Sequence, residues 1–154
     1  MTNRTLVVSI DALITADIPV LKQLPNLGRV MEHASWITDI ECIYPTLTYP
    51  CHATIATGCW PDRTGINNNE IPDFFAKGRM CASGAEYNIG EIWAPREEDD
   101  PTPWFTRANS PAVAKIFEAN KHMLRWMKTP QMDEFAAKCA ADIIRAHRPD
   151  LMLL

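Results

Sequence analysis

The sequence lacks the features that mark several large classes of protein. No apolar run is long enough to cross a bilayer, and the short N-terminal run meets Asp11, so we expect neither a membrane span nor a signal peptide. Basic residues number 15 against 19 acidic ones, which argues against binding of a nucleic-acid polymer. The five cysteines include no CxxC pair, and we therefore expect reduced thiols and a cytoplasmic location.

What is present is the composition of a globular protein. Of the 154 residues, 47% are hydrophobic and 22% are charged, and the formal net charge is −4. A chain of this length is expected to form one domain. It can bury about two-thirds of the surface that its unfolded form exposes, which is enough for a substantial core.

Strand and helix signals alternate along the chain. A nearly continuous apolar run at 5–10 predicts a buried parallel strand, and 25–34 predicts a helix with proline in its first turn. Residues 36–43 are rich in β-branched side chains and predict a second strand. Helices are predicted over 112–126 and after Pro130, and a last strand over 151–154. This order indicates the α/β class.

The predicted helix after Pro130 has a single apolar stripe, which should face the core. The stripe consists of Met132, Phe135, Ala136, Cys139, Ile143 and Ile144. The basic residues at the end of this helix, with His147 among them, suit the negative end of the helix dipole.

The most informative stretch is 44–58, which reads YPTLTYPCHATIATG. Pro45 and Pro50 favour extended backbone before them, so we expect a helix only from about 53, ended by Gly58. Thr48 would then lie just ahead of a helix N-terminus, where unpaired N–H groups favour an anion and would stabilise a threonine alkoxide. The alternative is that Thr46 and Thr48 only cap the helix.

Two more polar residues are candidates for a site. Asp11 follows the first predicted strand, and ligands of open α/β sheets bind beyond the carboxyl ends of strands. An aspartate that only caps the next turn is equally expected. Residues 59–69 predict a tight polar loop, and an asparagine from its end could return toward Thr48 and donate hydrogen bonds to an oxyanion. An ordinary asparagine-rich turn is the alternative there.

Several of these stretches resemble the alkaline phosphatase superfamily, specifically its type I phosphodiesterase/nucleotide pyrophosphatase branch. The matching stretches are VVSIDAL at 7–13, PNL at 25–27, YPTLTYPCH at 44–52, TG at 57–58, PDR at 61–63, GI at 65–66, Asn69, NIGEIW at 88–93 and RPDL at 148–151. Sulfatases resemble the same architecture but carry Cys or Ser in a C/S-x-P-x-R pattern, which Thr48 and the residues after it do not match.

The resemblance implies an alkaline-phosphatase-like fold with a mostly parallel sheet flanked by helices. It implies two zinc ions at the carboxyl edge of the sheet, with Asp11 as a ligand and Thr48 as both ligand and nucleophile. Asn69 would hold a phosphoryl oxygen, and Tyr49 and Asn69 would contact the substrate. The implied reaction is hydrolysis of phosphodiester or pyrophosphate bonds in small molecules such as nucleotides.

The chain also departs from the family pattern. The later metal ligands of the family have no counterpart, and none of the four histidines falls in a ligand motif. We therefore expect residues 1–154 to be the N-terminal portion of a single catalytic domain, truncated in mid-strand and weakly active or inactive alone. The alternative function is a non-catalytic α/β fragment or interaction module. An unpaired apolar strand edge would favour self-association.

Overall fold

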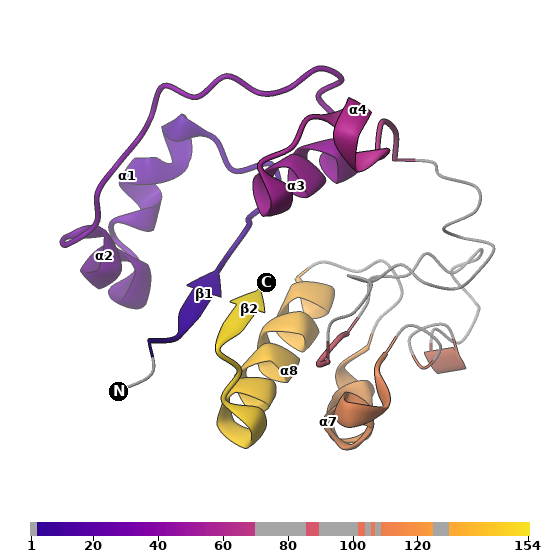
Figure 1. Ribbon diagram of the computed structural model, residues 1–154. Helices are drawn as coiled ribbons and strands as arrows, with labels where there is room; N and C mark the ends of the chain where they lie inside the picture. The colour runs from indigo at the N-terminus through magenta and orange to yellow at the C-terminus, as the bar shows by residue number, and fades with distance from the viewer. Residues whose placement is uncertain (1–2, 70–85, 90–101, 104–105, 107–108, 125–129) are drawn as a thin grey trace. The chain divides into compact units, whose positions relative to one another are not determined.

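The structure is a computed structural model that describes residues 3–69, 86–89, 102–103, 106, 109–124 and 130–154 (Figure 1). Two compact units can be separated. The first comprises Met1–Val7 and Ile71–Leu154, and the second comprises Val8–Glu70. Each unit is described by itself below.

The first unit contains a parallel pair of strands, β1 (Thr5–Val7) and β2 (Leu151–Leu153). Leu6 pairs with Met152, and the pair is extended at both ends by backbone hydrogen bonds of 2.9 Å, from Thr5 N–H to the Asp150 carbonyl and from Leu154 N–H to the Val7 carbonyl. The α/β class and the strand at the end of the chain are thereby confirmed.

The sheet nevertheless differs from the prediction. The first strand ends at Val7 rather than at residue 10. Its side chains are also more exposed than a sheet flanked by helices requires, since Leu6 is 52% exposed and Leu151 is 69% exposed. A central parallel strand buries both faces. The described residues therefore show a small parallel sheet without the layers of helices that would cover it.

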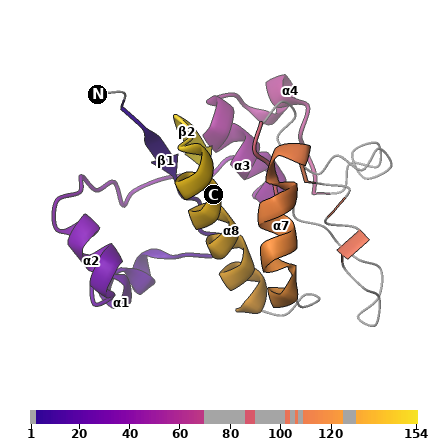
Figure 2. The same ribbon diagram turned by 90° about the horizontal axis from the view of Figure 1, so that it is seen from below.

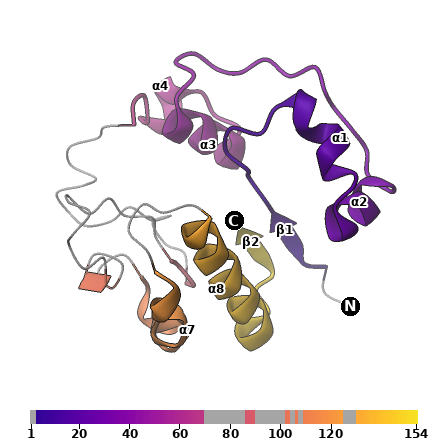
Figure 3. The same cartoon turned by 180° about the vertical axis from the view of Figure 1, so that it is seen from behind.

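The core of the first unit lies between two helices, α7 (Ala114–Asn120) and α8 (Gln131–His147), which run side by side in Figures 2 and 3. Phe117 of α7 meets Phe135 of α8 edge to face, with ring centroids 6.1 Å apart. Leu124 and Cys139 complete the buried cluster. Of the apolar stripe predicted for this helix, Phe135 and Cys139 are confirmed as buried, whereas Ala136 is exposed.

The helix predicted over 112–126 is divided. A 3₁₀ turn, η2 (Pro111–Val113), precedes α7, and a second, η3 (Lys121–Met123), follows it. The last residues of the prediction, 125–126, lie outside the described part of the chain. The α8 helix begins at Gln131, and Pro130 is its N-cap residue. With Pro130 at the first helical position, the helix would begin one residue earlier.

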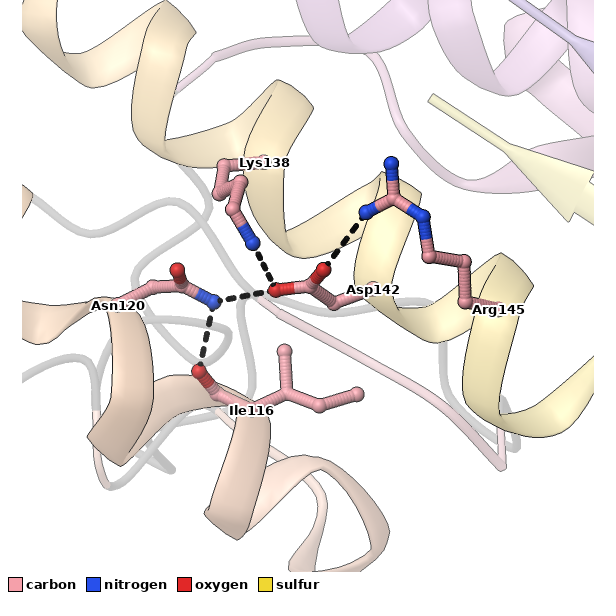
Figure 4. Close-up of polar contacts among 5 residues, drawn as sticks. All are labelled: Ile116, Asn120, Lys138, Asp142 and Arg145. Carbon is pink, nitrogen blue, oxygen red and sulfur yellow. Dashed lines mark hydrogen bonds and ion pairs between the residues drawn. The ribbon is translucent and has the colours of Figure 1, made fainter.

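A polar network joins α7 to α8 (Figure 4). The Asn120 side-chain amide donates to the Ile116 carbonyl at 2.9 Å and to the Asp142 carboxylate at 3.0 Å. Asp142 also accepts hydrogen bonds from Lys138 and from Arg145, the latter at 3.0 Å. These contacts, with Lys138 and Asn120 contributing most, lower the pKa of the Asp142 carboxyl from 3.8 to about 2.

This network predicts a specific acid sensitivity of the first unit. Because the pKa of Asp142 is lower in the folded than in the unfolded chain, its stabilising contribution is complete above about pH 4 and is lost as the pH falls through about 2. Urea unfolding at several pH values between 2 and 5 should therefore show a steeper loss of stability in the natural chain than in an Asp142→Asn variant. Parallel pH profiles for the two proteins would contradict this assignment.

The second unit is helical in its described residues. It contains η1 (Thr15–Asp17), α1 (Ile18–Leu21), α2 (Pro25–Met31), α3 (Thr48–Thr57) and α4 (Pro61–Thr64). The helix predicted over 25–34 is confirmed, although it ends at Met31. No helix in the described ranges is both long and apolar enough to cross a membrane.

The strand predicted over 36–43 is wrong, because these residues adopt no regular structure. Ile37 is 77% exposed, and among the described residues no strand pairs with this segment. Strand propensity reflects how β-branched side chains pack against neighbouring strands. Without such a neighbour, the β-branched composition of this segment does not produce a strand.

Candidate functional site

The candidate site is the N-terminal end of α3. This helix begins at Thr48, so Thr48 is its first residue and not the residue ahead of it. Proline is tolerated in a first turn because the N–H group that it lacks has no intrahelical partner there. The bias of Pro50 against a helical Tyr49 is therefore overcome. Gly58 ends the helix with a φ of 67°, as predicted.

Of the four residues at the start of α3, 47–50, two have a backbone N–H with a hydrogen-bond acceptor and one is a proline without an N–H. Leu47 N–H donates to the Pro45 carbonyl at 2.9 Å, Tyr49 N–H donates to the Asn69 side chain at 2.9 Å, and Pro50 has no N–H group. The N–H of Thr48 has no partner within the described residues. No described residue therefore pairs with the Thr48 N–H at the positive end of the α3 dipole, where an anion is favoured.

The side chain of Thr48 is similarly available. It is half-buried, and its hydroxyl makes no hydrogen bond to the part of the chain that the structure describes. The N-cap residue is Leu47, which provides no side-chain cap, and the Thr46 hydroxyl donates to the Ile43 carbonyl at 3.3 Å instead. Neither threonine caps α3, so the capping interpretation is wrong in this structure.

The side chain of Asn69 contacts the N-terminal end of α3, 20 positions after Tyr49 in the sequence. Its Oδ1 accepts the hydrogen bond from Tyr49 N–H, and its own N–H donates to the Asn68 side chain at 2.7 Å. Since Oδ1 is the acceptor, the Nδ2 amide remains a double donor. It has no partner among the described residues. The predicted return of an asparagine to the neighbourhood of Thr48 is therefore present in the structure.

The loop that carries Asn69 is more ordered than a tight polar turn. Residues Pro61–Thr64 form α4, which packs against α3 and ends at Gly65 with a φ of 73°. Proline at the first helical position explains the start of this short helix. Because α4 packs against α3, the residues that follow α4 begin close to α3, and Asn69 can reach the first turn of that helix.

Asp11 lies in a turn next to Ala12, whose N–H donates to the Asp11 carboxylate at 3.0 Å. Its charge also acts on α3. The pKa of the Cys51 thiol is raised, first by a hydrogen bond with Cys42, then by burial, and further by the negative charges of Cys42 and Asp11. The geometry of Asp11 is that of a turn residue, which agrees with the alternative that it only caps the next turn.

The two zinc ions implied by the resemblance require more ligands than this arrangement provides. Within the described ranges, no group of three or more His, Cys, Asp or Glu side chains lies close enough together to hold a metal ion. Asp11 and Thr48 therefore do not form a complete zinc site with the other described residues.

One contact of this site was not predicted from the sequence. The Sγ atoms of Cys42 and Cys51 lie 3.3 Å apart, nine positions apart in the chain. No spacing signal indicates this pairing, because it depends on the irregular path that the chain takes from Cys42 to α3. Tyr49 was predicted as a substrate contact, and in the structure its backbone N–H donates to the Asn69 side chain.

Comparisons with known proteins agree with the motifs. Rat ectonucleotide pyrophosphatase/phosphodiesterase family member 3 is 30% identical over 71 residues, which is 46% of this chain and 8% of that protein. Venom phosphodiesterase 2 of Crotalus adamanteus is 36% identical over 50 residues, 32% of this chain and 6% of that protein. Human family member 1 is 32% identical over 50 residues, 32% of this chain and 5% of that protein.

The aligned stretches thus span less than a tenth of the length of these curated relatives. No solved structure matches the chain significantly. The family model described as type I phosphodiesterase / nucleotide pyrophosphatase, in contrast, matches residues 5–152, nearly the whole chain. The protein therefore belongs to the type I phosphodiesterase/nucleotide pyrophosphatase family.

Proposed function

We propose that this protein contributes the nucleophile-bearing part of a hydrolase that cleaves phosphodiester or pyrophosphate bonds in small molecules such as nucleotides. The observation that carries the proposal is the first residue of α3. Thr48 offers both a hydroxyl and a backbone N–H without partners in the described chain, at the positive end of a helix. Family membership supplies the reaction class.

The proposed first step uses this geometry. The Thr48 hydroxyl gives its proton to water and Oγ1 attacks phosphorus, while the bond to the leaving oxygen breaks and that oxygen takes a proton from water and departs as an alcohol or phosphate. The open N–H of Thr48 and the helix dipole favour the developing negative charge. Water then attacks the phosphorus of the phosphothreonine ester and releases the second product, which restores the hydroxyl.

Asn69 has a supporting role in this proposal. With Oδ1 held by Tyr49 N–H, the Nδ2 donors lie near the first turn of α3, where they are available to a phosphoryl oxygen. Donors of this kind act most strongly on the charge that develops in the transition state. Tyr49 contributes by orienting the Asn69 amide, and we propose that it also borders the substrate.

Replacement of Asn69 by alanine tests this role. We expect turnover of a chromogenic phosphodiester such as bis(4-nitrophenyl) phosphate to fall about 10²- to 10³-fold, because one oxyanion donor is lost. Asn67→Ala is the matched control in the same loop, since Asn67 is exposed and makes no hydrogen bond to the described residues. Equal turnover in the two variants would remove Asn69 from the site.

Zinc dependence is a separate proposal that rests on the resemblance. It names Asp11 and Thr48 as two ligands and requires others beyond the described residues. Elemental mass spectrometry of the purified 154-residue chain tests it directly. About two zinc ions per chain would support the proposal, and essentially no bound zinc would contradict it for this chain and favour the non-catalytic alternative.

The proposed partners are small-molecule substrates, in a cytoplasmic setting. Self-association through the exposed strands is also proposed, because Leu6 and Leu151 leave apolar surface uncovered at the small sheet. Light scattering of the purified chain over a range of concentrations tests this point. A monomer at all concentrations would contradict it.

A further inference from the structure

The second unit contains a pair of thiols next to the candidate site. Cys42 is exposed and lies in the irregular segment ahead of α3, whereas Cys51 is half-buried within α3. Their Sγ atoms are 3.3 Å apart, a distance at which one thiol can donate a hydrogen bond to the other. The two sulfurs are therefore already in contact in the reduced chain.

The change needed to join the two sulfurs is small. A disulfide requires an S–S distance of about 2.05 Å, so the sulfurs must approach by about 1.3 Å from their present 3.3 Å. Cys51 is fixed by the helix, but Cys42 belongs to a segment without helix or strand. Rotation about the Cys42 side chain and adjustment of this segment can supply the movement without disturbing α3.

The other described thiols are less suited to this chemistry. The Cys59 thiol donates to the Thr57 carbonyl at 3.6 Å rather than facing another sulfur. Cys139 is buried in the core, and burial is the main cause that raises its pKa to about 11. Because a buried thiol is out of reach of a disulfide in solution, Cys139 should exchange slowly. Among the described cysteines, the geometry thus favours one pair.

We propose that Cys42 and Cys51 are an oxidisable dithiol, which a small-molecule disulfide such as oxidised glutathione converts into an intramolecular disulfide. The Cys42 thiolate attacks one glutathione sulfur and expels the other glutathione as a thiolate. The Cys51 thiolate then attacks Cys42 Sγ and expels the second glutathione. The chain loses two protons and two electrons, and the oxidant gains both as two molecules of reduced glutathione.

The new bond would enclose residues 43–50, and Thr48 lies within that loop. The inference goes beyond the proposed hydrolysis, because it depends only on the two sulfur atoms and their surroundings. Its test therefore needs no substrate and no metal. A failure of the hydrolase proposal would leave the disulfide result unaffected, and the reverse also holds.

The experiment equilibrates the full reduced chain with a mixture of oxidised and reduced glutathione, followed by an acid quench and alkylation of free thiols in denaturant. Chymotrypsin cleavage after Leu47 separates Cys42 from Cys51, so that a disulfide appears as two linked peptides in mass spectrometry. We expect the Cys42–Cys51 link to be at least tenfold more abundant than a link between any other two of the five cysteines.

Two variants make the result decisive. Cys59→Ser is the matched control and should retain the Cys42–Cys51 link. Because Cys51 and Cys59 lie on the same chymotryptic peptide, this variant also shows which of the two is linked to Cys42. Cys42→Ser changes an exposed residue and should abolish the link. The proposal would be overturned by mixed glutathione disulfides alone, by a dominant link to Cys59 or Cys81, or by full retention of both free thiols.

Discussion

Replacement of Thr48 by alanine should lower phosphodiester hydrolysis by at least about 10³-fold, because it removes the attacking oxygen. The fold of α3 should persist, since the Thr48 hydroxyl makes no capping hydrogen bond that the helix would lose. Initial rates with bis(4-nitrophenyl) phosphate, compared at equal concentrations of folded protein, measure the effect.

Two controls make this prediction specific. Thr48→Ser retains a hydroxyl at the same position and should keep measurable turnover. Thr46→Ala removes a nearby hydroxyl that bonds, among the described residues, only to the Ile43 carbonyl, and it should leave the rate within a few-fold of the natural chain. Turnover in Thr48→Ala equal to that of the natural chain would remove Thr48 from the role of nucleophile.

Replacement of Phe135 by alanine should destabilise the first unit by about 3–5 kcal/mol, the range observed when a buried aromatic side chain is truncated. Phe135 is 1% exposed and packs edge to face on Phe117, so its removal leaves a cavity between α7 and α8. Urea unfolding followed by far-UV circular dichroism measures the change in the free energy of unfolding.

The matched control for this variant lies on the same helix. Ile144 is 41% exposed, and Ile144→Ala should change the free energy of unfolding by less than about 1 kcal/mol. Similar losses in the two variants would contradict the placement of the core along the Phe135 side of α8.

The burial of Phe135 and the exposure of Ile144 also show how far the sequence could predict the fold. The 3.6-residue period predicted α8 and placed Phe135, Cys139 and Ile143 in the core, where all three are buried. The same period also included Ala136 and Ile144, at the two borders of the apolar stripe, and both of these side chains are exposed. Periodicity identifies a face, but the width of the buried stripe is decided by the elements that pack on it.

Predictions from short sequence patterns were less reliable where contacts with distant residues determine the conformation. The β-branched run at 36–43 predicted a strand, but strand formation depends on a neighbour that periodicity cannot supply. At α3, the rule for residues before proline predicted extended backbone at Tyr49, whereas that residue is helical and donates its N–H to Asn69. This long-range hydrogen bond could not be inferred from the local sequence.

The candidate site was also predicted only in part from the sequence. The motif around Thr48 and the run of asparagines identified residues that the structure brings to one helix end. The distances among them, and the partnership of Cys42 with Cys51, depend on the path of the intervening chain. A spacing of nine residues that includes two prolines carries no regular period from which such contacts could be derived.

The most direct test of the central proposal is to trap the intermediate on Thr48. The chain is mixed with a phosphodiester substrate, quenched in acid during turnover and digested, and its peptides are analysed by mass spectrometry. We predict that the mass of the transferred phosphoryl group appears on Thr48 and is absent from the Thr48→Ala variant. Covalent phosphoryl transfer to a different residue of the turning-over chain would contradict the assignment of Thr48 as the nucleophile.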